Sequence, residues 1–235
     1  MLRYILGNRM TILDYSELLQ EELEVRTAWG NANLKCHEIG ELVTPTGKVV
    51  ACDPFVFFET SAFTVQLSPG RYPVSLSVAH FDDGDQRVAY ASILIKEGRA
   101  HHWEMALVPG QDVDSLEPGH IFCYGVDSGT GCFMDLKASQ AFAERMNDDE
   151  DYSQALIAEL EKTYVHTWSW ANLEMDTETN ANLIAFSSGL GDGCYASYFG
   201  FDEEHNPMIL VTDFGVFSDD EVAEVLGRIR HSPPT

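Results

Sequence analysis

Four aspartates in or after two glycine-rich stretches are the first candidates for a catalytic or metal-binding role. The stretches read YGVDSGTGCFMD (Tyr124–Asp135) and SSGLGDGCYASYFGFD (Ser187–Asp202). Carboxylates that converge in space can hold a divalent cation or act as general acid and base. An Asp beside a turn more commonly caps backbone amides, so the catalytic assignment is kept as the alternative. The four candidates are Asp127, Asp135, Asp192 and Asp213.

The glycines of both stretches indicate tight turns, because glycine takes positive φ without steric cost. The two turns are expected to be either structural corners or the two walls of one ligand pocket. In the second case, Asp127 and Asp192 are the polar anchors of that pocket. The turn glycines are Gly125, Gly129, Gly131, Gly189, Gly191 and Gly193.

Cysteine and histidine side chains offer a second chemistry. Cys132 or Cys123 could act as a nucleophile if His101, His102 or His120 lay beside it as a base, but no familiar spacing links them. All five cysteines are expected to be reduced and mostly buried, because the chain has neither CxxC nor Cys/His ligand spacing.

Several common catalytic and metal-binding motifs are absent from the sequence. It contains no GxxxxGK[ST] phosphate loop, no HEXXH helix, no GxSxG elbow and no Cys₂His₂ pattern. The His101-His102 pair is interpreted as a strand end and not as a metal pair. We therefore predict no metal site and no cofactor, and the interpretation leans away from an enzyme.

The charge balance is the most unusual property of the composition. The chain has 38 acidic and 14 basic residues, a formal net charge of -24. Nucleic acids and anionic membranes need Lys and Arg to neutralise phosphate, so neither is expected as a partner. A basic protein is expected instead, because opposite charge accelerates encounter. Solubility or a salty habitat is the alternative explanation.

One acidic run is the expected contact surface for such a partner. It consists of Asp148, Asp149, Glu150 and Asp151, between two predicted helices. A charge run of this kind is usually a solvated loop. Together with the overall charge, it is also what an inhibitor of a cationic protein would present.

The spacing of apolar residues predicts mostly strands. An amphipathic helix is predicted over 14–28, short strands over 40–108 with an Asp83-Gly84 hairpin, and helices over 136–146 and 152–164. Further strands follow from 166 to 214, and Ser218 is expected to cap a last short helix. The predicted class is α+β: antiparallel β-sandwich-like sheets with a few helices, mostly in the C-terminal half.

Three segments are predicted, packed as one compact unit. They are an N-terminal helical segment (1–39), a β-rich half (40–110) and an α+β half (120–230). No apolar run reaches the roughly 18 residues of a membrane span, and no signal peptide is recognised. We therefore expect a cytoplasmic protein.

Five sequence blocks resemble the signature blocks of domain-of-unknown-function family 4241, a largely bacterial group. They are GKVVACDP, PGRYPV, YGVDSGTGCFMD, SGLGDGCYASYFGFD and ILVTDFGV, in the family's order over roughly residues 40–217. The chain departs from the family pattern at Tyr195-Ala196, where a Tyr-Pro type pair is typical. The resemblance implies an α+β fold and supplies no activity.

The function expected from these observations is that of an acidic protein-binding module. It would neutralise a basic partner such as a toxin domain, as an immunity protein or inhibitor of an antibacterial toxin or effector does. The alternative is an enzyme or small-ligand binder that uses a pocket between the turns at 125–135 and 189–193.

Overall fold

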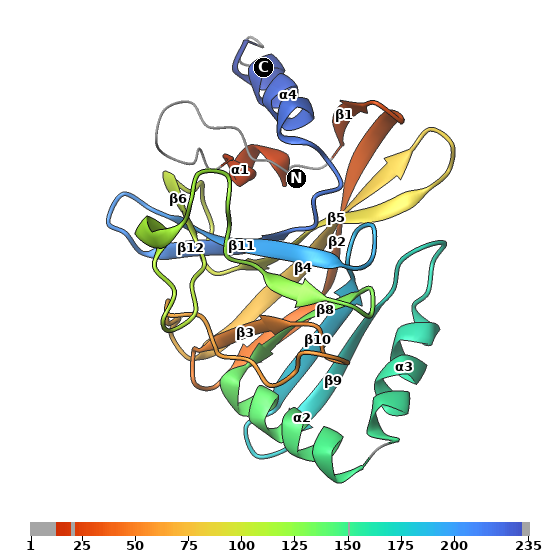
Figure 1. The fold of residues 1–235 in the computed structure, drawn as a ribbon, viewed down its shortest axis with the longest axis vertical. Helices are drawn as coiled ribbons and strands as arrows, with labels where there is room; N and C mark the ends of the chain where they lie inside the picture. The colour runs from red at the N-terminus through yellow and green to blue at the C-terminus, as the bar shows by residue number, and fades with distance from the viewer. Residues whose placement is uncertain (1–12, 20–21, 150, 232–235) are drawn as a thin grey trace.

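The computed structural model describes residues 13–19, 22–149 and 151–231 (Figure 1). Its strands form two antiparallel sheets packed against each other, and two helices cover the outer face of the smaller sheet. The predicted α+β class, with sandwich-like antiparallel sheets and helices mainly in the C-terminal half, is confirmed.

The larger sheet has eight strands in the order β1-β2-β4-β5-β12-β11-β6, with β7 paired to the first part of β11. These strands are β1 (Leu23–Thr27), β2 (Gly30–Thr44), β4 (Gly70–Phe81), β5 (Gln86–Leu94), β12 (Pro207–Asp213), β11 (Gly193–Phe201), β6 (His102–Met105) and β7 (Tyr124–Val126). One edge of β11 is therefore shared by β7 and β6, at successive positions along it.

The smaller sheet has the order β3-β8-β10-β9 and carries the main helices. Its strands are β3 (Val49–Cys52), β8 (Thr130–Asp135), β10 (Ala181–Ser187) and β9 (Trp170–Asp176). The helices in the described part of the chain are α1 (Tyr15–Leu18), α2 (Leu136–Asp148), α3 (Tyr152–Lys162), α4 (Asp219–His231) and the short 3₁₀ turn η1 (Val113–Ser115).

Strand β10 shows why the smaller sheet is apolar on both faces. Ile184 and Phe186 belong to the core between the two sheets. Leu183 and Ala185, which alternate with them, belong to a second core beneath α2 and α3. Successive side chains of a strand point to opposite faces, so a continuous apolar run fits a strand that is covered on both sides.

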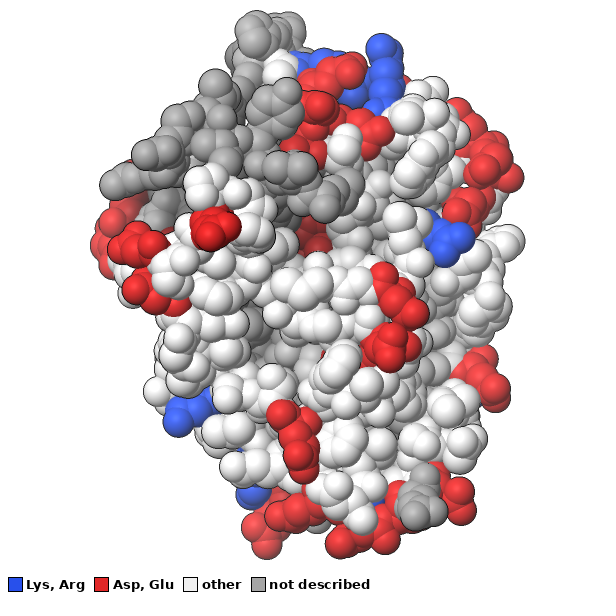
Figure 2. All heavy atoms as spheres, viewed as in Figure 1, with Lys and Arg blue, Asp and Glu red and all other residues white. Residues whose placement is uncertain are grey.

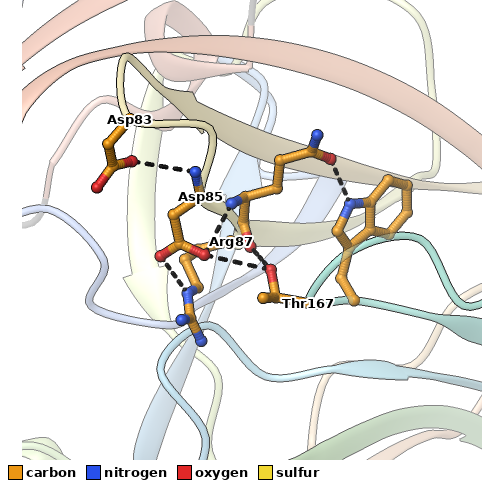
Figure 3. A network of polar contacts seen from close by, with 6 residues as sticks. Asp83, Asp85, Arg87 and Thr167 are labelled. Carbon is orange, nitrogen blue, oxygen red and sulfur yellow. Dashed lines mark hydrogen bonds and ion pairs between the residues drawn. The ribbon is translucent and has the colours of Figure 1, made fainter.

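A polar network joins the β4–β5 hairpin of the larger sheet to the segment before β9 (Figure 3). The Asp85 carboxylate accepts from the Arg87 Nε at 2.8 Å and from the backbone amide of Gln86 at 3.0 Å. Thr167 donates its hydroxyl to the Gln86 carbonyl, and the Trp168 indole donates to the Gln86 side chain at 2.9 Å. These bonds fix one end of the sandwich.

The predicted helix over 14–28 is wrong for most of its length. Among the described residues of this span only α1 is helical, and Leu23–Thr27 forms β1, which pairs with β2 through a turn at Ala28 and Trp29. Residues 1–12 and 20–21 of the predicted N-terminal segment lie outside the described residues. Its Val25 is buried against the core while the residues on either side of it are exposed, which is strand alternation. Because Leu18, Leu23 and Val25 match both patterns over so short a span, strand pairing decided the outcome. The 1–39 segment is therefore not helical over 23–39.

Other local predictions are confirmed. The helices over 136–146 and 152–164 appear as α2 and α3, and the Asp83-Gly84 hairpin joins β4 to β5. Ser218 and Glu221 form a capping box at α4: the Ser218 amide donates to the Glu221 carboxylate at 2.8 Å, and the Glu221 amide donates to the Ser218 hydroxyl at 3.4 Å. In the described part of the chain, no helix has the length and apolarity needed to cross a lipid bilayer.

Candidate functional site

The two glycine-rich turns meet in space. The Ser188 amide donates to the Gly129 carbonyl at 3.0 Å. Pairing of β8 with β10 and of β7 with β11 brings the strands on either side of both turns together. A Cβ placed on Gly129 would lie 3.8 Å from the Gly191 Cα. The turns therefore pack directly on one another as a double corner between the two sheets.

A buried carboxylate that the sequence interpretation missed holds the first turn. Asp53 accepts from the backbone amides of Asp127 and Ser128 at 2.9 and 2.8 Å, and from the Ser128 hydroxyl at 2.8 Å. It also accepts from the Phe55 amide at 2.8 Å. Its signal in the sequence is a single Asp before Pro54 at the end of a β-branched run, which local patterns do not connect to a turn 75 residues away.

A disulfide joins Cys123 to Cys194, which corrects the expectation that all five cysteines are reduced. The pairing of Gly125 with Cys194 in the β7–β11 ladder brings the two cysteines together, with their Cα atoms 5.4 Å apart. The two cysteines are 71 residues apart and match no motif spacing, so the sequence does not link them. Strand pairing alone brings them together. Cys36, Cys52 and Cys132 remain thiols.

The structure gives the Cys132 thiol little character of a nucleophile. It is fully buried, 3.6 Å from the Cys52 sulfur. Burial and the neighbouring Cys52 raise the pKa of Cys132 well above its ordinary value. A thiol of raised pKa stays protonated at neutral pH, and the thiolate is the nucleophilic form.

The four candidate carboxylates do not converge on one point. Asp127 is exposed in the turn before β8, while Asp135 is buried at the far end of that six-residue strand, whose two ends are roughly 17 Å apart by strand rise. Asp135 caps α2 by accepting from the Lys137 amide at 2.9 Å, and it also accepts from the Thr46 hydroxyl at 2.7 Å. The Asp135 carboxylate therefore has a capping role.

Asp192 and Asp213 are brought to the same cavity, of about 330 Å³, beside the second turn. Asp192 is exposed, and the nearly buried Asp213 accepts from the Tyr15 hydroxyl at 2.9 Å and from the Gly215 amide at 2.8 Å. Asp219 and Asp220 also line this cavity, which gives it an acidic wall. It lies beside the double corner and not between the two turns.

A groove of about 510 Å³ lies between the loop after β3 and the segment around β7. Val56 and Phe57, which are 44% and 46% exposed, contribute apolar surface to it. Glu59 and Asn147 line it as well, and the Asn147 amide donates to the Glu59 carboxylate at 3.2 Å. This groove therefore combines exposed apolar side chains with an acid.

The predicted acidic run follows directly after Asn147, at the turn between α2 and α3. Asp148, Asp149 and Asp151 are exposed, and Glu150 lies outside the described residues. The Asp149 carboxylate accepts from the Asp151 amide at 3.0 Å, which orders the turn locally. Figure 2 shows acidic side chains gathered at the lower end of this face, where Figure 1 places the α2–α3 turn.

Comparison with known proteins identifies the family and nothing more specific. Residues 42–212 match the family described as "Protein of unknown function (DUF4241)", and the chain belongs to this family. No curated protein and no solved structure matches the chain.

Proposed function

We propose that this member of DUF4241 is an acidic protein-binding module that binds and neutralises a basic partner. In its most specific form, the proposal is that the chain is an immunity protein, which inhibits a bacterial toxin or effector that acts on other bacteria. The observation that carries the proposal is the groove lined by Val56, Phe57 and Glu59, which adjoins the exposed acidic turn through Asn147.

The acidic surplus around this groove is not neutralised internally. Several of the basic residues are already paired with carboxylates, including Arg71 with Glu41 and Lys162 with Glu159. Within the described ranges, no cation lies at ion-pair distance from Asp148, Asp149 or Asp151. These carboxylates are therefore available to a partner.

The surface chemistry indicates how a basic partner would bind. Interfaces combine an apolar centre that excludes water with a polar rim that sets orientation. A Lys or Arg of the partner would pack its apolar stem against Phe57 and place its charge beside Glu59. The acidic turn would add long-range attraction, which raises the association rate more than the final affinity.

The experiment is a pull-down from bacterial lysate at low and high salt, followed by affinity measurement with the captured basic protein. Changing Asp148, Asp149 and Asp151 to Asn together with Glu150→Gln should slow association at low salt. Salt should remove most of that difference, because exposed charges are screened beyond about 10 Å at 0.1 M.

A matched control separates a local contact from the global field. Changing four exposed glutamates to Gln at other places alters the net charge by the same amount: Glu97, Glu117, Glu178 and Glu224. If both quadruple variants bind equally well, the acidic turn is not the contact surface. If Phe57→Ser leaves the dissociation rate unchanged, the groove is not the centre of the interface.

A cytoplasmic location is part of this proposal. Cytoplasmic reductants keep most protein thiols reduced. In a cytoplasmic protein the Cys123–Cys194 pair should therefore be reduced in the cell, which makes the location testable. Alkylation of thiols in rapidly quenched cells should then label both cysteines in the cytoplasmic pool. Full protection of both would place the protein in an oxidising compartment.

The alternative function, an enzyme or small-ligand binder, is favoured by the acidic cavity that Asp192 and Asp213 line. Such a cavity suits a small cationic ligand. A thermal-shift screen should then find a compound that stabilises the native chain and fails with Asp192→Asn. An equal shift in both proteins would remove Asp192 from the site.

A further inference from the structure

Three metal-ligating side chains converge at the edge of the larger sheet, away from the double corner. His102 and Glu104 lie on β6, and His205 lies in the turn between β11 and β12. The His102 Nε2 is 3.0 Å from the His205 Nδ1, and the Glu104 Oε1 is 3.6 Å from the former and 3.9 Å from the latter.

Strand geometry explains why the first two share one face. Residues two apart on a strand point to the same side, which places His102 beside Glu104. The β6–β11 pairing sets Phe201 opposite His102, so the turn that leaves β11 folds back over β6.

The turn that carries His205 is held in place by Asp202. Its carboxylate accepts from the Asn206 amide at 2.8 Å and from the Lys96 ammonium at 2.9 Å. The His205 amide donates to the Asp202 carbonyl at 3.1 Å. His205 itself has φ of 63°, in the left-handed region that a non-glycine residue adopts only where its surroundings impose it.

The two imidazole rings are also held by packing. The His205 ring lies 4.4 Å from the Phe201 ring with an interplanar angle of 2°, and the His102 ring lies 5.2 Å from it at 14°. Ligands that are fixed by neighbouring side chains lose less entropy when they bind. Packing therefore holds the two imidazole rings beside each other before any ion arrives.

We propose that His102, Glu104 and His205 bind a divalent transition-metal ion of the zinc class. The three separations of 3.0, 3.6 and 3.9 Å define a circle with a radius of about 2.1 Å, which is the length of a Zn–N or Zn–O bond. An ion at its centre is within bonding distance of all three donors. Ion binding would replace the hydrogen bond between the two nitrogens and would require both rings to rotate toward that centre.

The donor set selects the class of metal. Imidazole nitrogens favour zinc, copper, nickel and iron, whereas magnesium and calcium need oxygen ligands. Two histidines and one glutamate leave a fourth tetrahedral position for water or for a donor from a partner. The charge of -24 raises the local concentration of cations around the site.

The test uses the full chain without a histidine tag, stripped of metal with a chelator and then desalted. Calorimetric titration with Zn²⁺ should show one ion per chain, and Co²⁺ should give a visible spectrum without thiolate charge transfer. Two substitutions are chosen to preserve the fold. His205→Asn introduces a residue that tolerates positive φ, and His102→Phe keeps an aromatic ring against Phe201. Each should weaken Zn²⁺ binding more than about 100-fold, since outer-shell changes alone cost 10- to 100-fold.

His120→Ala is the matched control, because this histidine is exposed and lies outside the cluster. It should bind Zn²⁺ like the wild type, and millimolar Mg²⁺ should not compete. Zn²⁺ should raise the Tm of the wild type and leave that of His205→Asn unchanged. The proposal is overturned if binding is not stoichiometric, or if His205→Asn and His120→Ala bind Zn²⁺ with the same affinity.

Discussion

The Asp53 carboxylate accepts two hydrogen bonds of 2.8 Å from Ser128, one from its backbone amide and one from its hydroxyl. These bonds tie the end of β3 to the first glycine turn. Because the second turn packs on the first, Asp53 supports the whole double corner. The residue that organises this region is thus a buried acid and not one of the exposed acids in the turns.

Replacing Asp53 should therefore destabilise the fold far more than replacing Asp127. Asp53→Asn replaces one acceptor oxygen with an NH₂ donor that faces backbone N–H groups. This change should lower the free energy of unfolding by at least about 2 kcal/mol. Asp127→Asn, at an exposed position, should change it by less than about 0.5 kcal/mol. Urea denaturation measures both, and equal effects would contradict this assignment.

The disulfide should contribute measurable stability. It closes a loop over a separation of 71 residues, so losing it should lower the free energy of unfolding by about 2–4 kcal/mol. We expect this loss in the Cys123→Ser/Cys194→Ser variant. Dithiothreitol should bring the wild type to the level of the variant and leave the variant unchanged. A further loss in the reduced variant would mean that another bond is involved.

Gly189 of the second turn should tolerate a side chain less well than Gly129 of the first. A Cβ on Gly189 would lie 2.7 Å from the Phe214 Cβ, inside the core, at φ of 51°. Gly189→Ala should cost more than about 2 kcal/mol, because steric overlap adds to backbone strain. Gly129→Ala, at φ of 67° with only an ordinary contact of 3.8 Å to the Gly191 Cα, should cost only about 1 kcal/mol. Thermal denaturation of the two variants compares them directly.

Acid should destabilise the larger sheet through His37 and His80. Their rings lie 6.2 Å apart, and the His37 ring lies 5.0 Å from that of Trp168. Burial, and next the Lys35 ammonium, lower the pKa of both histidines, and His166 adds to the effect at His80. The unfolded chain then binds more protons, so stability is complete above about pH 6.5 and falls as pH drops below that value.

Urea unfolding at pH 7.5 and 5.5 tests this dependence. The wild type should lose more stability between these pH values than the His37→Phe/His80→Phe variant. The His120→Ala variant should behave like the wild type, because that histidine is exposed. An unchanged pH dependence in the double variant would show that other groups carry it.

Part of the fold could be predicted from local sequence and part could not. The helices α2 and α3, the Asp83-Gly84 hairpin and the Ser218 capping box all depend on residues within a few positions of each other. The helix expected over 14–28 failed where β1 forms instead. There, pairing with β2 outweighed a weak helical period, because strand pairing buries Val25 in the core.

The family, the fold class, the glycine turns and the strong negative charge can all be predicted from the sequence. Each of these depends on composition or on neighbours along the chain. Three contacts became visible only in the folded chain: Cys123 with Cys194, Asp53 with Ser128, and His102 with His205. These pairs are 71 to 103 residues apart and come together through strand register. A one-residue change in register reverses the face of every side chain, and local periodicity does not specify which strands pair.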